Sequence, residues 1–227
     1  MVRQFDRELA ELKNNILRMG ELAEQAAEKS IDSVLNRNSE LAKEVIIGDL
    51  VINEMELNID EQCLKLLALR QPLATDLRLI TAAMRINVDL ERIGDQAVNI
   101  AERALELNQR PPLDLPIDIK SMAKIALDMV QTSIKAFIQQ NPQMAIQVCQ
   151  RDVEVDTLDD EYIQKLLKFM LQETPPVGRT VHYIIIIRNL ERIADLATNI
   201  AEDIVFIVEG KVIKHRCEDY ILGTGYI

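Results

Sequence analysis

The sequence predicts an all-α protein, a tandem duplication of a three-helix bundle with six long antiparallel helices. Its composition favours helices, because there are only seven Gly, seven Pro and no Trp among 227 residues. Such a chain has few turns and packs helices on helices. The duplication is seen in the segment 90–102, which recurs at 190–202 with ten of thirteen positions identical. A recurrence of this kind indicates an internal repeat.

Apolar residues three and four positions apart predict the helices of the first copy, at about residues 6–35, 39–69 and 74–107. Asn38 or Ser39 is suited to cap the second of these helices. Pro72 ends it, because the residue before a proline avoids the helical conformation. We therefore assign residues 1–112 to the first repeat.

The second copy follows the same plan, with helices expected at about residues 116–140, 142–172 and 178–208. Asn141 is a cap followed by a proline at the first helical position, and the Pro175-Pro176 pair stops the middle helix. Gly210 is suited to end the last helix. We assign residues 113–210 to the second repeat and residues 211–227 to an irregular C-terminal tail.

Charge and composition exclude several classes of function. A net charge of −11 argues against binding to nucleic acid or anionic lipid, since phosphate contacts need clustered Lys and Arg. No apolar run approaches the roughly 20 residues of a membrane span, and the N-terminus lacks a signal-peptide pattern. Three scattered Cys without a Cys-x-x-Cys pair fit a reducing compartment. We expect a cytoplasmic protein that is peripheral to a membrane at most.

Polar identity also persists in the duplicated segment. Four polar side chains of each copy fall within an arc of about 80° on the helix; they are Glu91, Asp95, Asn99 and Glu102, and Glu191, Asp195, Asn199 and Glu202. Shared apolar residues would indicate only a core. Polar residues shared on one face are not explained by a core and indicate a further constraint.

The middle helices carry matching stripes. These are Asp49, Asn53, Glu56 and Asp60 in the first copy, and Asp152, Asp156 and Asp159, followed by Ile163, in the second. Acids four residues apart on a helix repel each other by a few tenths of a kcal/mol, and a bound cation reverses that sign. Oxygen ligands without His or Cys suit Mg²⁺, Mn²⁺, Ca²⁺ or carboxylate-bridged iron.

Two structural alternatives stay open for these residues. An acidic face opposite an apolar face is also what a solvated helix presents. Arg92 and Arg192, which flank the repeated acids, could form ion pairs between helices instead of serving a site.

The sequence shows no catalytic machinery. There is no phosphate-binding glycine loop and no His-Glu-x-x-His motif. The two His have no Glu three residues before them, as the ligand pattern of ferritin-like di-iron proteins would require. We predict that the protein is not an enzyme.

The segments Glu-Arg-Ile-Gly-Asp (91–95) and Glu-Arg-Ile-Ala-Asp (191–195), on the third helix of each repeat, resemble the PhoU family of phosphate-uptake regulators. The resemblance covers nearly the whole chain. It implies a cytoplasmic regulator that negatively controls the phosphate ABC transporter and phosphate-starvation signalling through a sensor histidine kinase. It also implies a homodimer.

The resemblance further implies paired metal-binding motifs on two helices of each repeat. By position, the second copy would use Asp152, Asp156, Glu191 and Asp195. The first copy would use Asp49, Glu91 and Asp95, with Asn53 where the pattern has an acid. One fewer charge predicts a weaker first site.

We therefore predict a metal-binding helical adaptor that holds Mg, Mn or Fe through carboxylates and binds no nucleic acid. The alternatives are a metal-free structural or interaction bundle and a carboxylate-bridged metalloenzyme. Direct sensing of phosphate by the protein is a third, and the acidic stripes would repel phosphate unless a metal bridged it.

Overall fold

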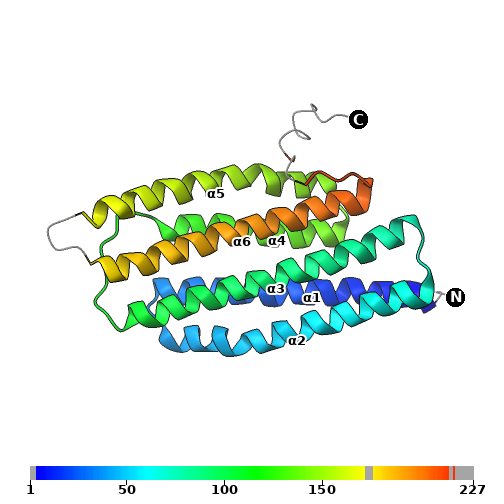
Figure 1. Cartoon of the computed structure of the whole chain (residues 1–227), viewed down its shortest axis with the longest axis horizontal. Coiled ribbons are helices and arrows are strands. Elements are labelled where there is room, and N and C mark those ends of the chain that lie inside the picture. The colour runs from blue at the N-terminus through cyan, green and yellow to red at the C-terminus, as the bar shows by residue number, and fades with distance from the viewer. Residues whose placement is uncertain (1–3, 172–175, 215–216, 218–227) are drawn as a thin grey trace.

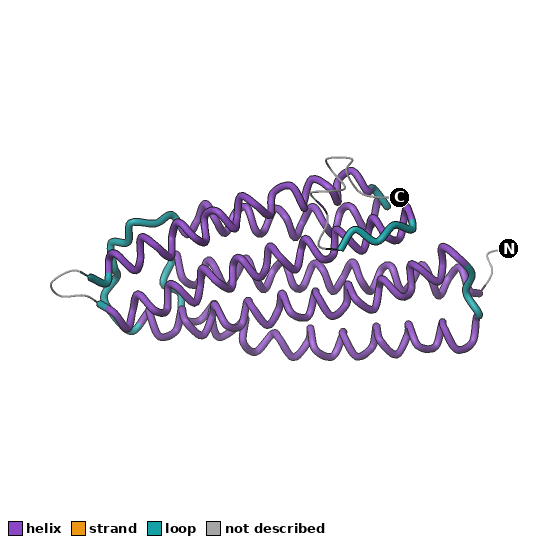
Figure 2. Tube along the Cα trace, turned by 45° about the horizontal axis from the view of Figure 1, so that its top comes forward, coloured by secondary structure: helices purple, strands orange, loops and turns teal. Residues whose placement is uncertain are grey.

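The computed structural model describes residues 4–171, 176–214 and 217. Six α-helices account for nearly all of them (Figure 2). Their bounds are α1 Gln4–Leu35, α2 Ser39–Arg70, α3 Ala74–Asn108, α4 Ile119–Gln139, α5 Pro142–Phe169 and α6 Val177–Glu209. The six predicted helices are confirmed.

Most predicted helix ends are confirmed by their capping bonds. Asn38 caps α2 by accepting a hydrogen bond from the backbone N–H of Leu41 at 3.1 Å. Asn141 accepts from two backbone N–H groups of α5, and Pro142 is the first residue of that helix. Gly210 ends α6 with a φ of 71°, a left-handed conformation that glycine adopts without strain.

Two ends were misplaced. The helix α4 begins at Ile119 rather than near residue 116, because the Asp118 side chain accepts a hydrogen bond from the Ser121 N–H and caps the helix there. The helix α5 ends at Phe169 rather than near Gln172, and Gln172 lies outside the described residues, as does Pro175.

The first repeat (α1–α3) and the second repeat (α4–α6) are each a bundle of three helices that run along the long axis of the molecule (Figure 1). The repeats meet where α3 packs on α6 and α1 packs on α4. Their buried residues form one hydrophobic core that includes Leu12, Ile59, Ile93, Leu166 and Ile193. The predicted division of the chain at residue 112, within the connection between α3 and α4, stays a prediction.

An ion pair with a buried carboxylate crosses the interface between the repeats. Arg85 of α3 donates to both carboxylate oxygens of Asp203 on α6, at 2.7–3.0 Å, and the Asp203 side chain is 3% exposed. The same guanidinium lies 5.3 Å from the centre of the Phe206 ring. These contacts fix the relative position of α3 and α6, the two helices that carry the duplicated segment.

The middle helix of each repeat lies at an outer edge of the molecule. In Figure 1, α2 and α5 occupy opposite sides, with α3 and α6 between them. The helix α2 packs on α1 and α3, and α5 packs on α4 and α6. The seams α2–α3 and α5–α6 are therefore open to solvent along one side. No helix in the described part of the chain is both long and apolar enough to cross a membrane.

Candidate metal centre

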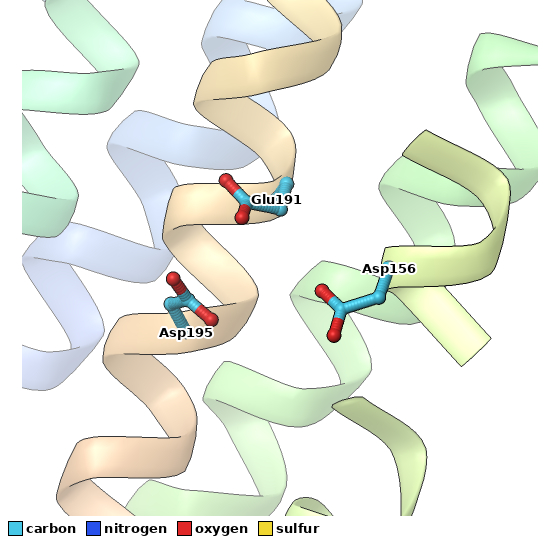
Figure 3. Close-up of side chains that lie close together, drawn as sticks. All are labelled: Asp156, Glu191 and Asp195. Atoms are coloured by element: carbon cyan, nitrogen blue, oxygen red, sulfur yellow. The ribbon is translucent and has the colours of Figure 1, made fainter. Parts of the chain in front are cut away.

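Three carboxylates converge at the seam between α5 and α6. One oxygen from each of Asp156, Glu191 and Asp195 lies within 4.8 Å of the other two (Figure 3). Asp156 comes from α5, and the other two come from successive turns of α6. Among the residues that the structure describes, no other three acidic, His or Cys side chains lie this close together.

The two helices bring these side chains together because their opposite faces are pinned in the core. Ile193, Ala194 and Ala197 are fully buried on α6, and Val155 is fully buried on α5. Residues four apart on a helix lie one above the other, so the two α6 carboxylates stand side by side. Asp156 and Asp195 are exposed and Glu191 is half-buried, which leaves the cluster accessible from solvent.

Burial and, after it, the crowding of negative charge raise the pKa values of carboxyl groups in the cluster. Burial, followed by the charges of Asp195 and Asp159, raises the pKa of Glu191 from its ordinary value of 4.5 to about 7. Burial and the Asp156 charge also raise the pKa of Asp195. Each shift means that the ionised carboxylate is less stable here than in water. A cation among these oxygens would supply the missing opposite charge.

Asp152 lies one turn before Asp156 on α5, at the edge of the cluster. Burial and then the charges of Asp195 and Asp156 raise its pKa to about 6. A side-chain hydrogen bond with Thr198 partly offsets this rise. The Oδ1 atom of Asp152 is buried, and a bound ion would compensate the cost of burying a charged oxygen. The four predicted residues of the second repeat are therefore neighbours, and three of them each bring one oxygen within 4.8 Å of the other two.

The first repeat has the same arrangement with one acid replaced. Asn53 donates a hydrogen bond from its side-chain amide to Oδ2 of Asp49 at 2.9 Å, while Oδ1 of each of these residues is buried and unpaired. Burial and the charge of Asp95 raise the pKa of Glu91, and burial and the charge of Asp49 raise that of Asp95. The four side chains are thus neighbours, but they do not form a three-carboxylate cluster.

A close approach of α2 to α3 accompanies this difference. A Cβ atom on Gly94 would lie 3.0 Å from Cδ1 of Ile52 and 3.4 Å from Oδ1 of Asp49. The second repeat has Ala194 at the matching position. The missing methyl group therefore lets the Asp49 carboxylate rest against the α3 backbone between Glu91 and Asp95.

Comparison with known proteins shows which family the two repeats belong to. The family model described as "PhoU domain" matches the chain twice, over residues 16–104 and 119–204. The chain belongs to the PhoU family. The resemblance read from the two Glu-Arg-Ile segments is confirmed.

Several relatives match over nearly their whole length. The chain is 39% identical to the "Phosphate-specific transport system accessory protein PhoU homolog" of Aquifex aeolicus over 210 residues, covering 92% of this chain and 95% of that protein. It is 35% identical to the Pseudomonas aeruginosa homolog over 213 residues, covering 93% of this chain and 88% of the other.

Two solved PhoU structures share the fold. The crystal structure of PhoU from P. aeruginosa has a TM-score of 0.88 at 36% identity, covering 92% of this chain and 100% of that one. The crystal structure of the phosphate transport system regulatory protein PhoU from Streptococcus pneumoniae has a TM-score of 0.85 at 30% identity, covering 92% and 99%.

The last two polar residues of each duplicated segment, at 99 and 102 and at 199 and 202, lie in different environments in the two repeats. Glu102 is exposed and pairs with the neighbouring Arg103 at 3.0 Å. Glu202, its mate, is 5% exposed on α6. Asn99 is exposed, whereas Asn199 lines a recess beside α3. Sequence identity at these positions therefore does not correspond to one shared environment.

The alternative of an ion pair between helices, left open for Arg92, is not found among the described residues. Arg92 lies 3.7 Å from Asp89, three residues earlier on the same helix. Arg192 is exposed, and its charge only partly offsets the effects of burial and of Asp156 on the pKa of Asp195.

Sequence reasoning missed the basic residue that does link α5 and α6 beside the second PhoU site. Arg188 donates to Oδ2 of Asp159 at 2.6 Å, and the Asp159 side chain is 3% exposed. Arg188 lies three residues before Glu191, so it is on the same face of α6. Position 88 of the first repeat is Val, and the comparison of the two copies therefore gave no sign of it.

Proposed function

We propose that this chain acts in phosphate uptake as a cation-holding helical adaptor, which negatively controls a phosphate ABC transporter and phosphate-starvation signalling. Membership of the PhoU family supports the pathway, because relatives that match almost end to end are named as accessory proteins of phosphate-specific transport. The carboxylate cluster of Asp156, Glu191 and Asp195 is the observation that supports a cation. The proposed action is binding, and no reaction is assigned to the site.

The donor set fits a hard divalent or iron cation. All four side chains of the second site offer carboxylate oxygens, which are the ligands that Mg²⁺ prefers and that Mn²⁺ and iron accept. The buried Oδ1 of Asp152 supports the same proposal. Asp152, Asp156, Glu191 and Asp195 would hold the ion in the second repeat. Asp49, Glu91 and Asp95, with Asn53, would hold a weaker one in the first.

The physical effect of the cation follows from the charges at the seam. Without it, the carboxylates of α5 and α6 repel each other, which after burial is the second cause of the raised pKa values of Glu191 and Asp152. With it, the same oxygens attract a common centre and draw the two helices together. The spacing of α5 and α6 and the charge of their shared surface then depend on the ion. We propose that the regulated partner recognises this surface.

The proposed partners are the phosphate ABC transporter and a phosphate sensor histidine kinase, met from the cytoplasmic side. The protein would associate with the membrane only through them, since a net charge of −11 is repelled by an anionic lipid surface. It would act as a homodimer and bind no nucleic acid.

Elemental analysis of the purified chain tests the site. The double variant Asp156→Asn/Asp195→Asn removes two charges from the cluster with little change in side-chain volume. We expect it to lose most of the bound metal, while the matched variant Asp49→Asn/Asp95→Asn of the first repeat loses less. Equal metal content in wild type and the second-repeat variant would refute the assignment.

A pull-down from membranes of phosphate-replete cells tests the adaptor role. The tagged chain should capture transporter components in buffer with Mn²⁺ or Mg²⁺ and capture less of them with chelator present. Capture that is equal in both buffers favours the metal-free interaction bundle instead.

A further inference from the structure

Two of the three cysteines lie against each other in the second repeat. Cys149 is buried on α5, and Cys217 is half-buried in the tail that follows α6. Their side chains are hydrogen-bonded to each other. The two residues are far apart in the sequence, so the fold brings them together. We call Cys149 and Cys217 the thiol pair.

The tail is held in place by packing. It turns back from the end of α6 along the second repeat (Figure 1), and Gly210 makes this turn with a φ of 71°. Ile213 is then buried, and the Cys217 side chain packs against the same hydrophobic core. These contacts keep the thiol of the tail beside α5 without a covalent bond.

Packing alone does not explain a cysteine at position 149. A buried cysteine often acts only as a small apolar residue. With the middle helices aligned as Asp49 with Asp152, the first repeat has Ile46 at this position, so an ordinary apolar side chain serves the fold there. The second thiol is what distinguishes Cys149. The remaining cysteine, Cys63, is fully buried on α2 in the first repeat.

We propose that the thiol pair is a reversible oxidation site, at which a disulfide bond between Cys149 and Cys217 ties the tail to α5 when the surroundings become oxidising. Disulfides in a reducing compartment are usually transient and redox-sensing. The two thiols are already in contact, so little further order has to be gained before the bond forms. This inference concerns the tail and is independent of cation binding and of phosphate uptake.

The oxidant is a low-molecular-weight disulfide, and the reaction consists of two exchanges. The Cys217 thiolate first attacks one sulfur of the reagent, whose S–S bond breaks, so that one reagent thiolate leaves. Cys149 then gives up its proton and attacks the Cys217 sulfur, and the second reagent thiolate leaves. Two protein thiols are oxidised while one reagent disulfide is reduced to two thiols, so atoms and electrons balance.

The surroundings of the pair decide which thiol reacts first. The hydrogen bond with Cys217, followed by burial, raises the pKa of Cys149 above its ordinary value of 9.0, and Cys149 is only 6% exposed. Such a thiol is inert towards reagents in solution. Cys217 is therefore the point of entry, and Cys149 displaces the reagent from it. The nearby charges of Glu202 and Asp152 favour an uncharged reagent over an anionic one.

Reaction of the reduced full chain with hydroxyethyl disulfide, which is uncharged, tests the proposal. The remaining thiols are then alkylated, and mass spectrometry of the intact chain and of its peptides identifies the products. We expect wild type to lose two of its three alkylatable thiols, to gain a cross-link between Cys149 and Cys217 within one chain, and to keep Cys63 reduced. Dithiothreitol should restore all three thiols.

Single variants separate the roles of the two thiols. In Cys149→Ser, we expect Cys217 to keep the reagent as a mixed disulfide, because no neighbouring thiol displaces it. In Cys217→Ser, we expect Cys149 to stay reduced, because the reagent does not reach it. Cys63→Ser is the matched control and should form the cross-link as wild type does. Circular dichroism verifies that all variants are folded.

Oxidation should also stabilise the protein. The cross-link closes a loop of about 70 residues, and the restriction that this places on the unfolded chain should raise the melting temperature by roughly 5–15 °C. Thermal melts of oxidised and reduced wild type measure this difference. Cys217→Ser should melt at the same temperature after either treatment.

Three results would overturn the inference. A wild-type chain that keeps all its alkylatable thiols shows that the pair does not close. A cross-link that involves Cys63, or that joins two chains, places the reactive thiols elsewhere. A cross-linked chain that melts below the reduced chain shows that the bond distorts the fold and does not form from the native contact.

Discussion

The substitution Glu191→Gln should stabilise the cation-free protein at alkaline pH. Burial and the neighbouring acids raise the pKa of Glu191 from 4.5 to about 7. A carboxyl whose pKa is raised on folding reduces stability above pH 7, where it is ionised in both states. That loss disappears as the pH falls from 7 towards 4.5, because the folded state then holds a proton that the unfolded state has released. The neutral amide carries no such cost at any pH.

The size of the expected stabilisation follows from the pKa shift of Glu191 and from the exposure of its side chain. A shift of this size corresponds to about 3 kcal/mol by linkage. Glu191 is only half-buried, so solvent screening reduces the effect to roughly 1–2 kcal/mol. For a chain of this length that is a rise of roughly 2–8 °C in melting temperature.

Thermal melts followed by circular dichroism measure this effect, with chelator present, at pH 8 and at pH 5. We expect Glu191→Gln to melt above wild type at pH 8 and close to it at pH 5. Addition of Mn²⁺ should reverse the order, because an ion that binds only the folded state stabilises it by about 2.7 kcal/mol at 100 times its dissociation constant. Glu154→Gln, an exposed α5 change away from the cluster, should behave as wild type throughout.

The reasoning fails if the chelated variant melts at or below wild type at pH 8. It also fails if the difference between the two proteins is the same at both pH values. Either result would mean that the Glu191 carboxylate is not destabilised by burial and by the neighbouring acids, and the electrostatic argument for a cation at this seam would lose its basis.

Three further substitutions test other parts of the structure. Asn53→Asp supplies the missing acid of the first repeat, and we expect bound metal per chain, measured by elemental analysis, to increase. Leu166→Ala empties a fully buried position and should lower the free energy of unfolding by about 2–5 kcal/mol in urea titrations, whereas the adjacent, 45% exposed Leu167 should tolerate the same change. Arg188→Ala leaves the buried Asp159 carboxylate without its 2.6 Å partner and should cost about 1–3 kcal/mol by the same measurement.

The helices could be predicted from the sequence because their signals are local. Apolar spacing, the Asn38 and Asn141 caps and the Gly210 terminator each act within a few residues, and the structure confirms them. The predicted start of α4 near residue 116 is wrong, because the Asp118 side chain caps the helix and α4 begins at Ile119.

The candidate site was predictable in part, because it depends on two kinds of information. Helical spacing places Glu191 and Asp195 on one face, and comparison of the repeats pointed to Asp156. The rotation of α5 against α6 decides which acids meet, and it depends on core packing that no local pattern encodes. For that reason the Arg188–Asp159 and Arg85–Asp203 ion pairs were not foreseen. Neither pair is duplicated between the repeats, so identity between copies could not reveal it.

The differences between the two repeats concern two faces of the same helix. On the side that meets the third helix, the second repeat has Asp156 where the first has Asn53. On the outer side, the first repeat has Leu57 where the second has Asp160. The apolar outer side of α2 and the acid-rich seam between α5 and α6 therefore lie at opposite edges of the molecule.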